Sequence, residues 1–148
     1  MISFTSRFKF TFNRLWQYTD VFVINVSSPN TPNLRDLQGV EQLRIIIEAC
    51  KQVNQQKSAE FSISPKPLLV KVAPDMSLEQ LEDIVTLAIE CECSGIVATN
   101  TTVARVGELS GDKNLQESGG MSGVPLRTTS TEFIKHIYLF TNGTFPII

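Results

Sequence analysis

The chain has 148 residues, of which 42% are hydrophobic and 19% are charged, a composition typical of one globular domain and not of a disordered segment. Its 13 basic and 15 acidic residues give a net charge of −2, which argues against nucleic acid as a partner because phosphate binding needs clustered positive charge. No apolar run approaches the ~18 residues that a membrane-spanning helix requires.

The first nineteen residues contain Arg7, Lys9 and Arg14, several Ser and Thr, many aromatic residues and no acid. This composition has a weak similarity to a mitochondrial presequence. It also fits an amphipathic helix that leads into the first strand, and both interpretations stay open at this point.

Four short apolar runs predict strands. In chain order they are Val21–Asn25, Leu68–Ala73, Gly95–Thr99 and Phe145–Ile148. Apolar residues at three- and four-residue steps predict a helix over Val40–Gln55, followed by a polar surface connection over 56–67. A capping box, in which the side chains of Ser77 and Gln80 bind each other's free backbone amides, predicts a second helix over Ser77–Cys91.

A similar motif, Thr129-Ser130-Thr131-Glu132, predicts the start of a third helix that ends near Asn142-Gly143. The three cysteines, Cys50, Cys91 and Cys93, have no spacing typical of a metal or redox pair, so we expect reduced and mostly buried thiols and no metal site.

Polar residues follow the predicted strands at one end. The first strand ends in Asn25, the second contains Lys71, and the third ends in Thr99 followed by Asn100 and Thr101. Alternating strands and helices predict a parallel sheet, and chemistry gathered at the carboxyl ends of parallel strands is typical of the (β/α)8 TIM barrel. That barrel needs eight strands, so the sequence predicts an incomplete barrel with about four of the eight.

Several of these side chains suit a small polar ring. The amides of Asn25, Asn30 and Asn100 can bind the alternating N–H and C=O groups of a cyclic imide such as a pyrimidine. Lys71 lies within an apolar strand, where its charge fits an anion that develops during a reaction, although a strand-end lysine can also reach water. The hydroxyl of Ser28 has the simpler alternative of capping a turn.

Four motifs resemble those of the dihydroorotate dehydrogenase family. They are Asn25-Val-Ser-Ser-Pro-Asn-Thr31, Leu69-Val-Lys-Val-Ala-Pro-Asp75, Ala98-Thr-Asn-Thr-Thr102 and Ser118-Gly-Gly-Met-Ser-Gly123-Val-Pro-Leu-Arg127, in order between about residue 18 and residue 148. The resemblance implies a barrel enzyme that uses flavin mononucleotide (FMN) to oxidise dihydroorotate to orotate in pyrimidine synthesis. Soluble relatives have cysteine where Ser28 stands, so the serine implies the membrane-associated, quinone-reducing class.

The resemblance also implies roles for individual residues. Ser28 is the expected catalytic base; the expected substrate ligands are Asn25, Asn30, Asn100 and Thr101; the expected flavin ligands are Asn25, Lys71, Thr99, Ser122 and Gly123. Asn30–Asp36 is expected to form a loop that closes over the substrate.

The whole chain, 1–148, is thus predicted to be part of one catalytic barrel, with residues 1–17 matching the family poorly. The resemblance implies quinone as electron acceptor, with the quinone site and any membrane association in an N-terminal region outside this chain. It implies the mitochondrial inner membrane in a eukaryote, or the cytoplasmic membrane in a bacterium. The alternative is a catalytically inactive, truncated fragment of the enzyme, since half a parallel barrel leaves unpaired sheet edges.

Overall fold

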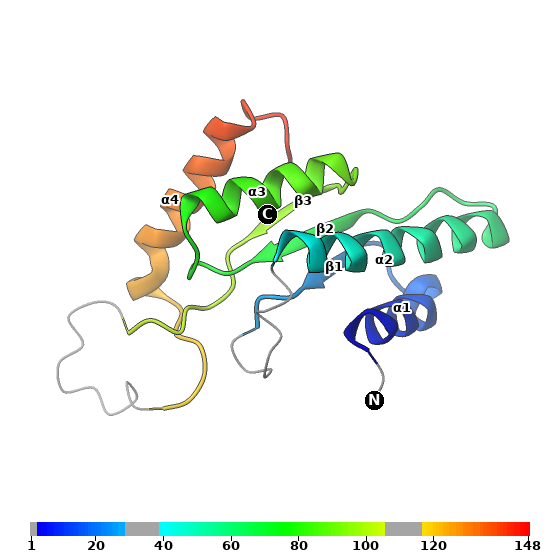
Figure 1. Ribbon diagram of the computed structural model, residues 1–148, viewed down its shortest axis with the longest axis horizontal. Coiled ribbons are helices and arrows are strands. Elements are labelled where there is room, and N and C mark those ends of the chain that lie inside the picture. Colours follow the sequence, from blue (N-terminus) through cyan, green and yellow to red (C-terminus); the bar gives the residue numbers. More distant parts are fainter. Residues whose placement is uncertain (1–2, 29–38, 106–116) are drawn as a thin grey trace.

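The computed structural model describes residues 3–28, 39–105 and 117–148 (Figure 1). Its elements, in chain order, are α1 (Phe4–Leu15), the 3-10 turn η1 (Trp16–Tyr18), β1 (Phe22–Asn25), α2 (Val40–Phe61), β2 (Leu68–Val72), α3 (Leu78–Glu90), β3 (Gly95–Ala98) and α4 (Val124–Phe140). Strands and helices alternate as the sequence predicts.

The sheet is parallel and has the strand order β1-β2-β3, so the carboxyl ends of all three strands meet at one edge. The predicted fourth strand lies beside β3 but forms only an isolated parallel bridge, between Ile96 and Ile147. Backbone hydrogen bonds of 2.9 Å join Ile96 N to Pro146 O and Ala98 N to Ile148 O. The described part of the chain therefore has three strands and a C-terminal segment bridged to β3, an α/β arrangement consistent with an incomplete barrel.

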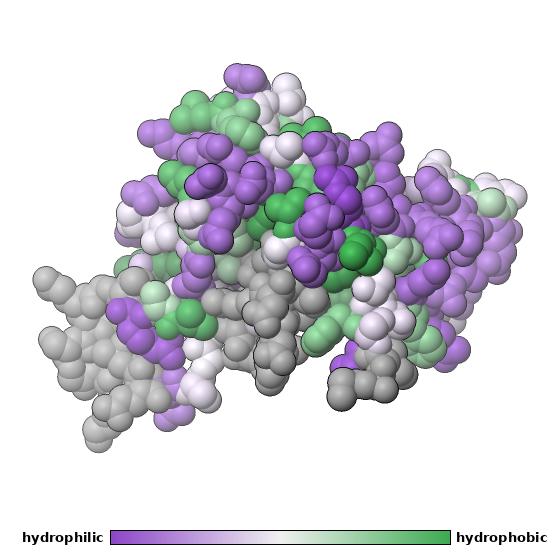
Figure 2. Space-filling view, viewed as in Figure 1, coloured by the Kyte–Doolittle hydropathy of each residue, from purple (hydrophilic) through white to green (hydrophobic). Residues whose placement is uncertain are grey.

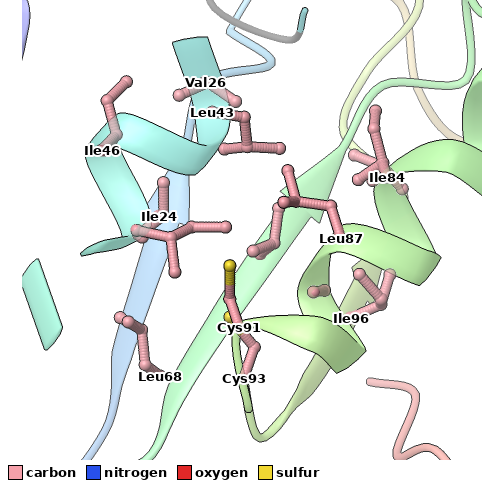
Figure 3. Packing of buried hydrophobic residues seen from close by; sticks show 14 of the residues in the cluster. Ile24, Val26, Leu43, Ile46, Leu68, Ile84, Leu87, Cys91, Cys93 and Ile96 are labelled. Carbon is pink, nitrogen blue, oxygen red and sulfur yellow. The ribbon is translucent and has the colours of Figure 1, made fainter. Parts of the chain in front are cut away.

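One face of the sheet packs against the helices. Neighbouring Ile24, Val70 and Ile96 are in register and are at most 2% exposed. They share a core with apolar residues of α2 and α3 (Figure 3), including Leu43, Ile46, Ile84 and Leu87. Since side chains alternate along a strand, the intervening residues point to the other face of the sheet.

The N-terminal segment forms the predicted helix before the first strand. Ser3 caps α1, and Phe12, 4% exposed, stacks on Phe22 of β1 with 3.8 Å between ring centroids. Trp16 is buried, and its Nε1–H donates to Asn54 Oδ1 of α2 over 2.8 Å. Helix α1 is therefore anchored to α2 and to the sheet.

Two helix boundaries differ from the predictions. Helix α2 extends six residues past Gln55, to Phe61, so the predicted surface connection is partly helical. Its last turns bind the rest of the fold, because the Asn54 side chain exchanges hydrogen bonds with the backbone of Lys66. Helix α4 begins at Val124, with Pro125 in its first turn, so the prediction of a start at Thr129 is wrong.

The helices carry their polar residues on the outer side. Figure 2 shows hydrophilic side chains over most of the visible face, interrupted by apolar patches. Tyr138 and Leu139 of α4 are among the exposed apolar residues. Within the ranges that the structure describes, no helix combines the length and apolarity needed to cross a membrane.

Candidate active site

The face of the sheet turned away from the helices carries two of the predicted ligands side by side. Asn25, the last residue of β1, is in register with Lys71 of β2, and Lys71 is in register with Val97 of β3. All three are outside the helix-facing core. The parallel sheet therefore places the Asn25 amide and the Lys71 ammonium in one cross-strand row near the carboxyl edge.

The Asn25 amide is held by a network that also contains Ser27 and Asn100. Ser27 Oγ donates to Asn25 Oδ1 over 3.1 Å, and Asn100 Nδ2 donates to Ser27 Oγ over 3.0 Å and to Asn25 Oδ1 over 3.3 Å. The backbone amide of Ser27 also donates to Asn25 Oδ1, over 3.3 Å. The oxygen of Asn25 is thus bound by three donors, whereas its NH₂ group has no partner among the described residues and can donate to a carbonyl.

Asn100 is more occupied than the sequence suggested. Its two side-chain N–H groups point at Asn25 and Ser27, and its Oδ1 accepts from the backbone amide of Thr101 over 2.9 Å. Its own backbone amide donates to Val72 O over 2.8 Å, which fixes the exit of β3 against β2. Asn100 therefore orients Asn25, and among the described contacts only one lone pair of its oxygen is left for another partner.

Lys71 is half-buried, and its ammonium group has no hydrogen bond or ion pair within residues 3–28, 39–105 and 117–148. Thr99, just after β3, has a buried Oγ1 that also lacks a hydrogen-bond partner within those ranges. An unpaired ammonium and an orphaned hydroxyl near one sheet edge fit a ligand that offers both negative charge and hydrogen-bond acceptors or donors.

Two further predicted ligands, Ser122 and Gly123, lie in the loop before α4. Backbone hydrogen bonds between Thr102 and the neighbouring Met121, 2.7 and 3.0 Å long, fasten this loop to the exit of β3. Gly123 is the N-cap of α4 and has φ 81° and ψ −148°, a conformation essentially restricted to glycine. The loop is thus joined to the carboxyl edge through Thr102, and in the described ranges no hydrogen bond links it to Asn25 or Lys71.

The predicted base, Ser28, is half-buried and lies three residues after β1. The predicted ligand Asn30 and the loop Asn30–Asp36 lie outside the described residues. The structure thus places Asn25 beside Lys71 and joins Asn25 to Asn100, which in turn bonds to Thr101. The roles of all the predicted site residues, including Ser28 and Asn30, stay predictions.

Sequence reasoning missed Ser27, which is 0% exposed and bonds to two predicted ligands. The available signal was period-two alternation, since Ser27 follows Asn25 by two residues and shares its side of the extended chain. It also missed the structural role of Asp75, which binds Thr102 and the backbone amide of Val103.

The three cysteines are free and buried, as predicted. Burial raises the pKa of Cys50 from 9.0 to about 11 and that of Cys93 to about 12, so both are protonated at neutral pH. The pKa of Cys91 is also raised, mainly by burial. No group of His, Cys, Asp and Glu in the described ranges has an arrangement suited to a metal ion.

Comparison with known proteins agrees with this geometry. The family model described as dihydroorotate dehydrogenase matches residues 5–148. A relative from Christiangramia forsetii named dihydroorotate dehydrogenase (quinone) is 45% identical over 141 residues, and the match covers 95% of this chain and 39% of the relative. The mitochondrial dihydroorotate dehydrogenase (quinone) of Oryza sativa is 42% identical over 134 residues, covering 90% of this chain and 28% of the relative.

The solved structure of dihydroorotate dehydrogenase from Eimeria tenella in complex with ferulenol superposes with a TM-score of 0.88 at 33% identity, covering 99% of this chain and 42% of that one. The chain spans between about a quarter and two fifths of the length of the curated relatives described above. The match includes most of the N-terminal segment 1–17 and all the strands. The chain belongs to the dihydroorotate dehydrogenase family.

Proposed function

We propose that this chain contributes part of the active site of a quinone-type dihydroorotate dehydrogenase. In this role it takes part in the FMN-dependent oxidation of dihydroorotate to orotate, with quinone as electron acceptor, in pyrimidine biosynthesis. The observation that carries the proposal is the row of Asn25 and Lys71, with Asn25 oriented by Ser27 and Asn100 at the carboxyl edge of a parallel sheet.

The residues at this edge fit a flavin. A reduced flavin carries negative charge beside its carbonyl groups. The Lys71 ammonium, which has no partner among the residues that the structure describes, suits that charge. The NH₂ group of Asn25 suits a ring carbonyl, and the orphaned Oγ1 of Thr99 has a hydrogen bond to offer. Together with Ser122 and Gly123, these residues form the proposed flavin contacts of this chain.

The substrate residues have a separate task. Asn25, Asn30, Asn100 and Thr101 hold the dihydroorotate ring so that its C5–H faces Ser28 and its C6–H faces the flavin. Ser28 takes the C5 proton as the general base and passes it to solvent. When bound, FMN would supply the acceptor for the C6 hydride, and quinone would be the final electron acceptor. The products of one cycle are orotate and a reduced quinone.

A serine base favours the quinone-reducing class, and the relatives described above are named for that class. The proposed location is therefore a membrane surface: the mitochondrial inner membrane in a eukaryote or the cytoplasmic membrane in a bacterium. The name of the Oryza sativa relative describes that protein as mitochondrial. We expect the quinone to bind outside the residues of this chain.

Flavin titration of the purified 148-residue chain tests the proposal. We expect FMN to bind stoichiometrically, seen as quenched flavin fluorescence, and Lys71→Gln to weaken binding roughly tenfold or more, the range for a charged hydrogen bond. Lys66→Gln is the matched control, because Lys66 lies over the Trp16 ring, 5.0 Å from its centroid, before the other end of β2. Equal binding by both variants would remove Lys71 from the flavin site.

A second variant tests the catalytic role of Ser28 independently of flavin binding. Ser28→Ala is expected to leave FMN bound and to cut dihydroorotate oxidation by roughly 10²–10⁴. A chain that binds no FMN under any condition would contradict the proposal and support the alternative, a fragment without independent activity.

A further inference from the structure

The carboxylate of Asp75 joins the exits of two strands. Asp75 lies three residues after β2, and Thr102 lies four residues after β3. The Thr102 hydroxyl donates to Asp75 Oδ1, and the backbone amide of Val103 donates to Asp75 Oδ2 over 3.2 Å. Thr102 is only 3% exposed, and its Oγ1 also accepts from the backbone amide of Ala104 over 2.9 Å. One carboxylate therefore fixes the conformation of residues 102–104.

The segment 102–105 in turn holds the loop before α4. Thr102 N donates to Met121 O over 3.0 Å, and Met121 N donates to Thr102 O over 2.7 Å. The Arg105 guanidinium adds a second attachment, because its Nη2 donates to Glu117 O over 2.7 Å and to Gly119 O over 3.2 Å. Residues 117–121 are thus fastened at two places to a segment whose own shape depends on Asp75.

These contacts form a continuous path between two parts of the proposed site. Thr101, a proposed substrate ligand, directly precedes Thr102, while Ser122 and Gly123, proposed flavin ligands, directly follow Met121. A shift of Thr102 must therefore move both groups of ligands. Placement within about an ångström matters for reaction rates, so such a support has a functional consequence.

We infer that Asp75 is a positioning residue that sets the place of the Ser122–Gly123 flavin loop relative to the substrate ligand Thr101, acting through Thr102. The flavin part of this inference rests on the proposed function. Asp75 itself touches neither substrate nor flavin in this account. The hydroxyl of Thr102 and the two attachments of residues 117–121 transmit its effect.

Hydrogen–deuterium exchange of the purified chain tests the inference without requiring catalysis. In Asp75→Ala we expect amides of 102–105 and 117–123 to exchange at least about fivefold faster, because each lost hydrogen bond to the carboxylate shifts local opening by about that factor. Asp75→Asn keeps a side-chain oxygen for one of the two donors and is expected to restore part of the protection. Asp83→Ala removes an exposed carboxylate of α3 and is the control.

The interior of α3 distinguishes positioning from general stability. Exchange over 81–88 is expected to match wild type in Asp75→Ala, and a parallel rise there would mean that Asp75 only stabilises the fold. Exchange at 117–123 equal to that of Asp83→Ala would overturn the inference directly.

FMN titration of the same variants measures the effect of Asp75 on flavin affinity. We expect Asp75→Ala to weaken FMN binding at least about fivefold and Asp75→Asn to weaken it less. A loosened loop with unchanged FMN affinity would refute the coupling between Asp75 and the flavin ligands. Absence of FMN binding by the wild-type chain would count against the proposed function alone, and the exchange pattern would then decide whether Asp75 holds the loop.

Discussion

Ser27→Ala is the most informative single change to the hydrogen-bond network of the site. The variant removes the hydroxyl that donates to Asn25 Oδ1 over 3.1 Å and accepts from Asn100 Nδ2 over 3.0 Å. Because Ser27 is 0% exposed, water does not replace it freely. Two lost hydrogen bonds, one of which leaves a donor of Asn100 unpaired, predict a loss of about 1–3 kcal/mol in the free energy of unfolding.

Urea unfolding followed by the fluorescence of Trp16, the one tryptophan of the chain, measures this loss. A loss of this size lowers the melting temperature by roughly 2–12 °C for a domain of this length. Ser130→Ala, on α4, is the control and is expected to change stability by no more than about 0.5 kcal/mol.

A double-mutant cycle locates the effect. Ser27→Ala and Asn100→Ala are expected to be non-additive by about 0.5–3 kcal/mol, because the two side chains share a hydrogen bond. Additive losses of unfolding free energy in the double mutant would show that Ser27 and Asn100 do not act together to orient Asn25. A Ser27→Ala variant as stable as Ser130→Ala would do the same.

Three further predictions concern stability. Gly123→Ala is expected to cost about 1–3 kcal/mol in thermal unfolding although an added Cβ meets no atom within 4 Å, because φ 81° with ψ −148° strains any other residue; an unchanged melting temperature would contradict this. Ser77→Ala breaks the capping box with Gln80 and is expected to cost about 0.5–2 kcal/mol in urea unfolding, whereas a neutral effect would mean that the cap does not stabilise α3. Burial raises the pKa of the Cys50 thiol from 9.0 to about 11 and that of the Cys93 thiol to about 12. The stability that the two protonated thiols contribute is therefore complete below pH 9 and is lost as the pH rises towards these folded-state pKa values. A free energy of unfolding that did not fall over this pH range, or that fell equally steeply in Cys50→Ala, would contradict this prediction.

The sequence predicted the elements whose signals are local. The apolar runs identified β1, β2 and β3, and the Ser77–Gln80 motif identified the start of α3, where both capping hydrogen bonds are present. The similar motif at Thr129 failed, because Pro125 already starts α4 and the Thr131 hydroxyl donates back to Arg127 O inside the helix. A capping motif in sequence therefore does not exclude a helix that begins earlier.

Features that depend on distant contacts were harder to predict. The last turns of α2 lack a strong apolar stripe. Hydrogen bonds of the Asn54 side chain to Trp16 and Lys66 help to hold this part of the helix in place. The place of Asn25, Lys71 and Asn100 followed from parallel strand order, but the bonds that occupy Asn100 did not. Hydrogen-bond saturation of a side chain depends on the register between strands, which composition and periodicity do not contain.

Reduction of bound flavin by dihydroorotate shows whether Asn25, Lys71 and Ser28 form one site around the flavin. The purified chain is loaded with FMN, mixed with dihydroorotate in the absence of oxygen, and followed by visible absorbance. If Asn25, Lys71 and Ser28 share one site, the flavin absorbance bleaches in the wild type, while Ser28→Ala keeps the flavin and stays yellow. Flavin that binds normally but is not bleached by saturating dihydroorotate, or that bleaches at the same rate in Ser28→Ala, would contradict the claim.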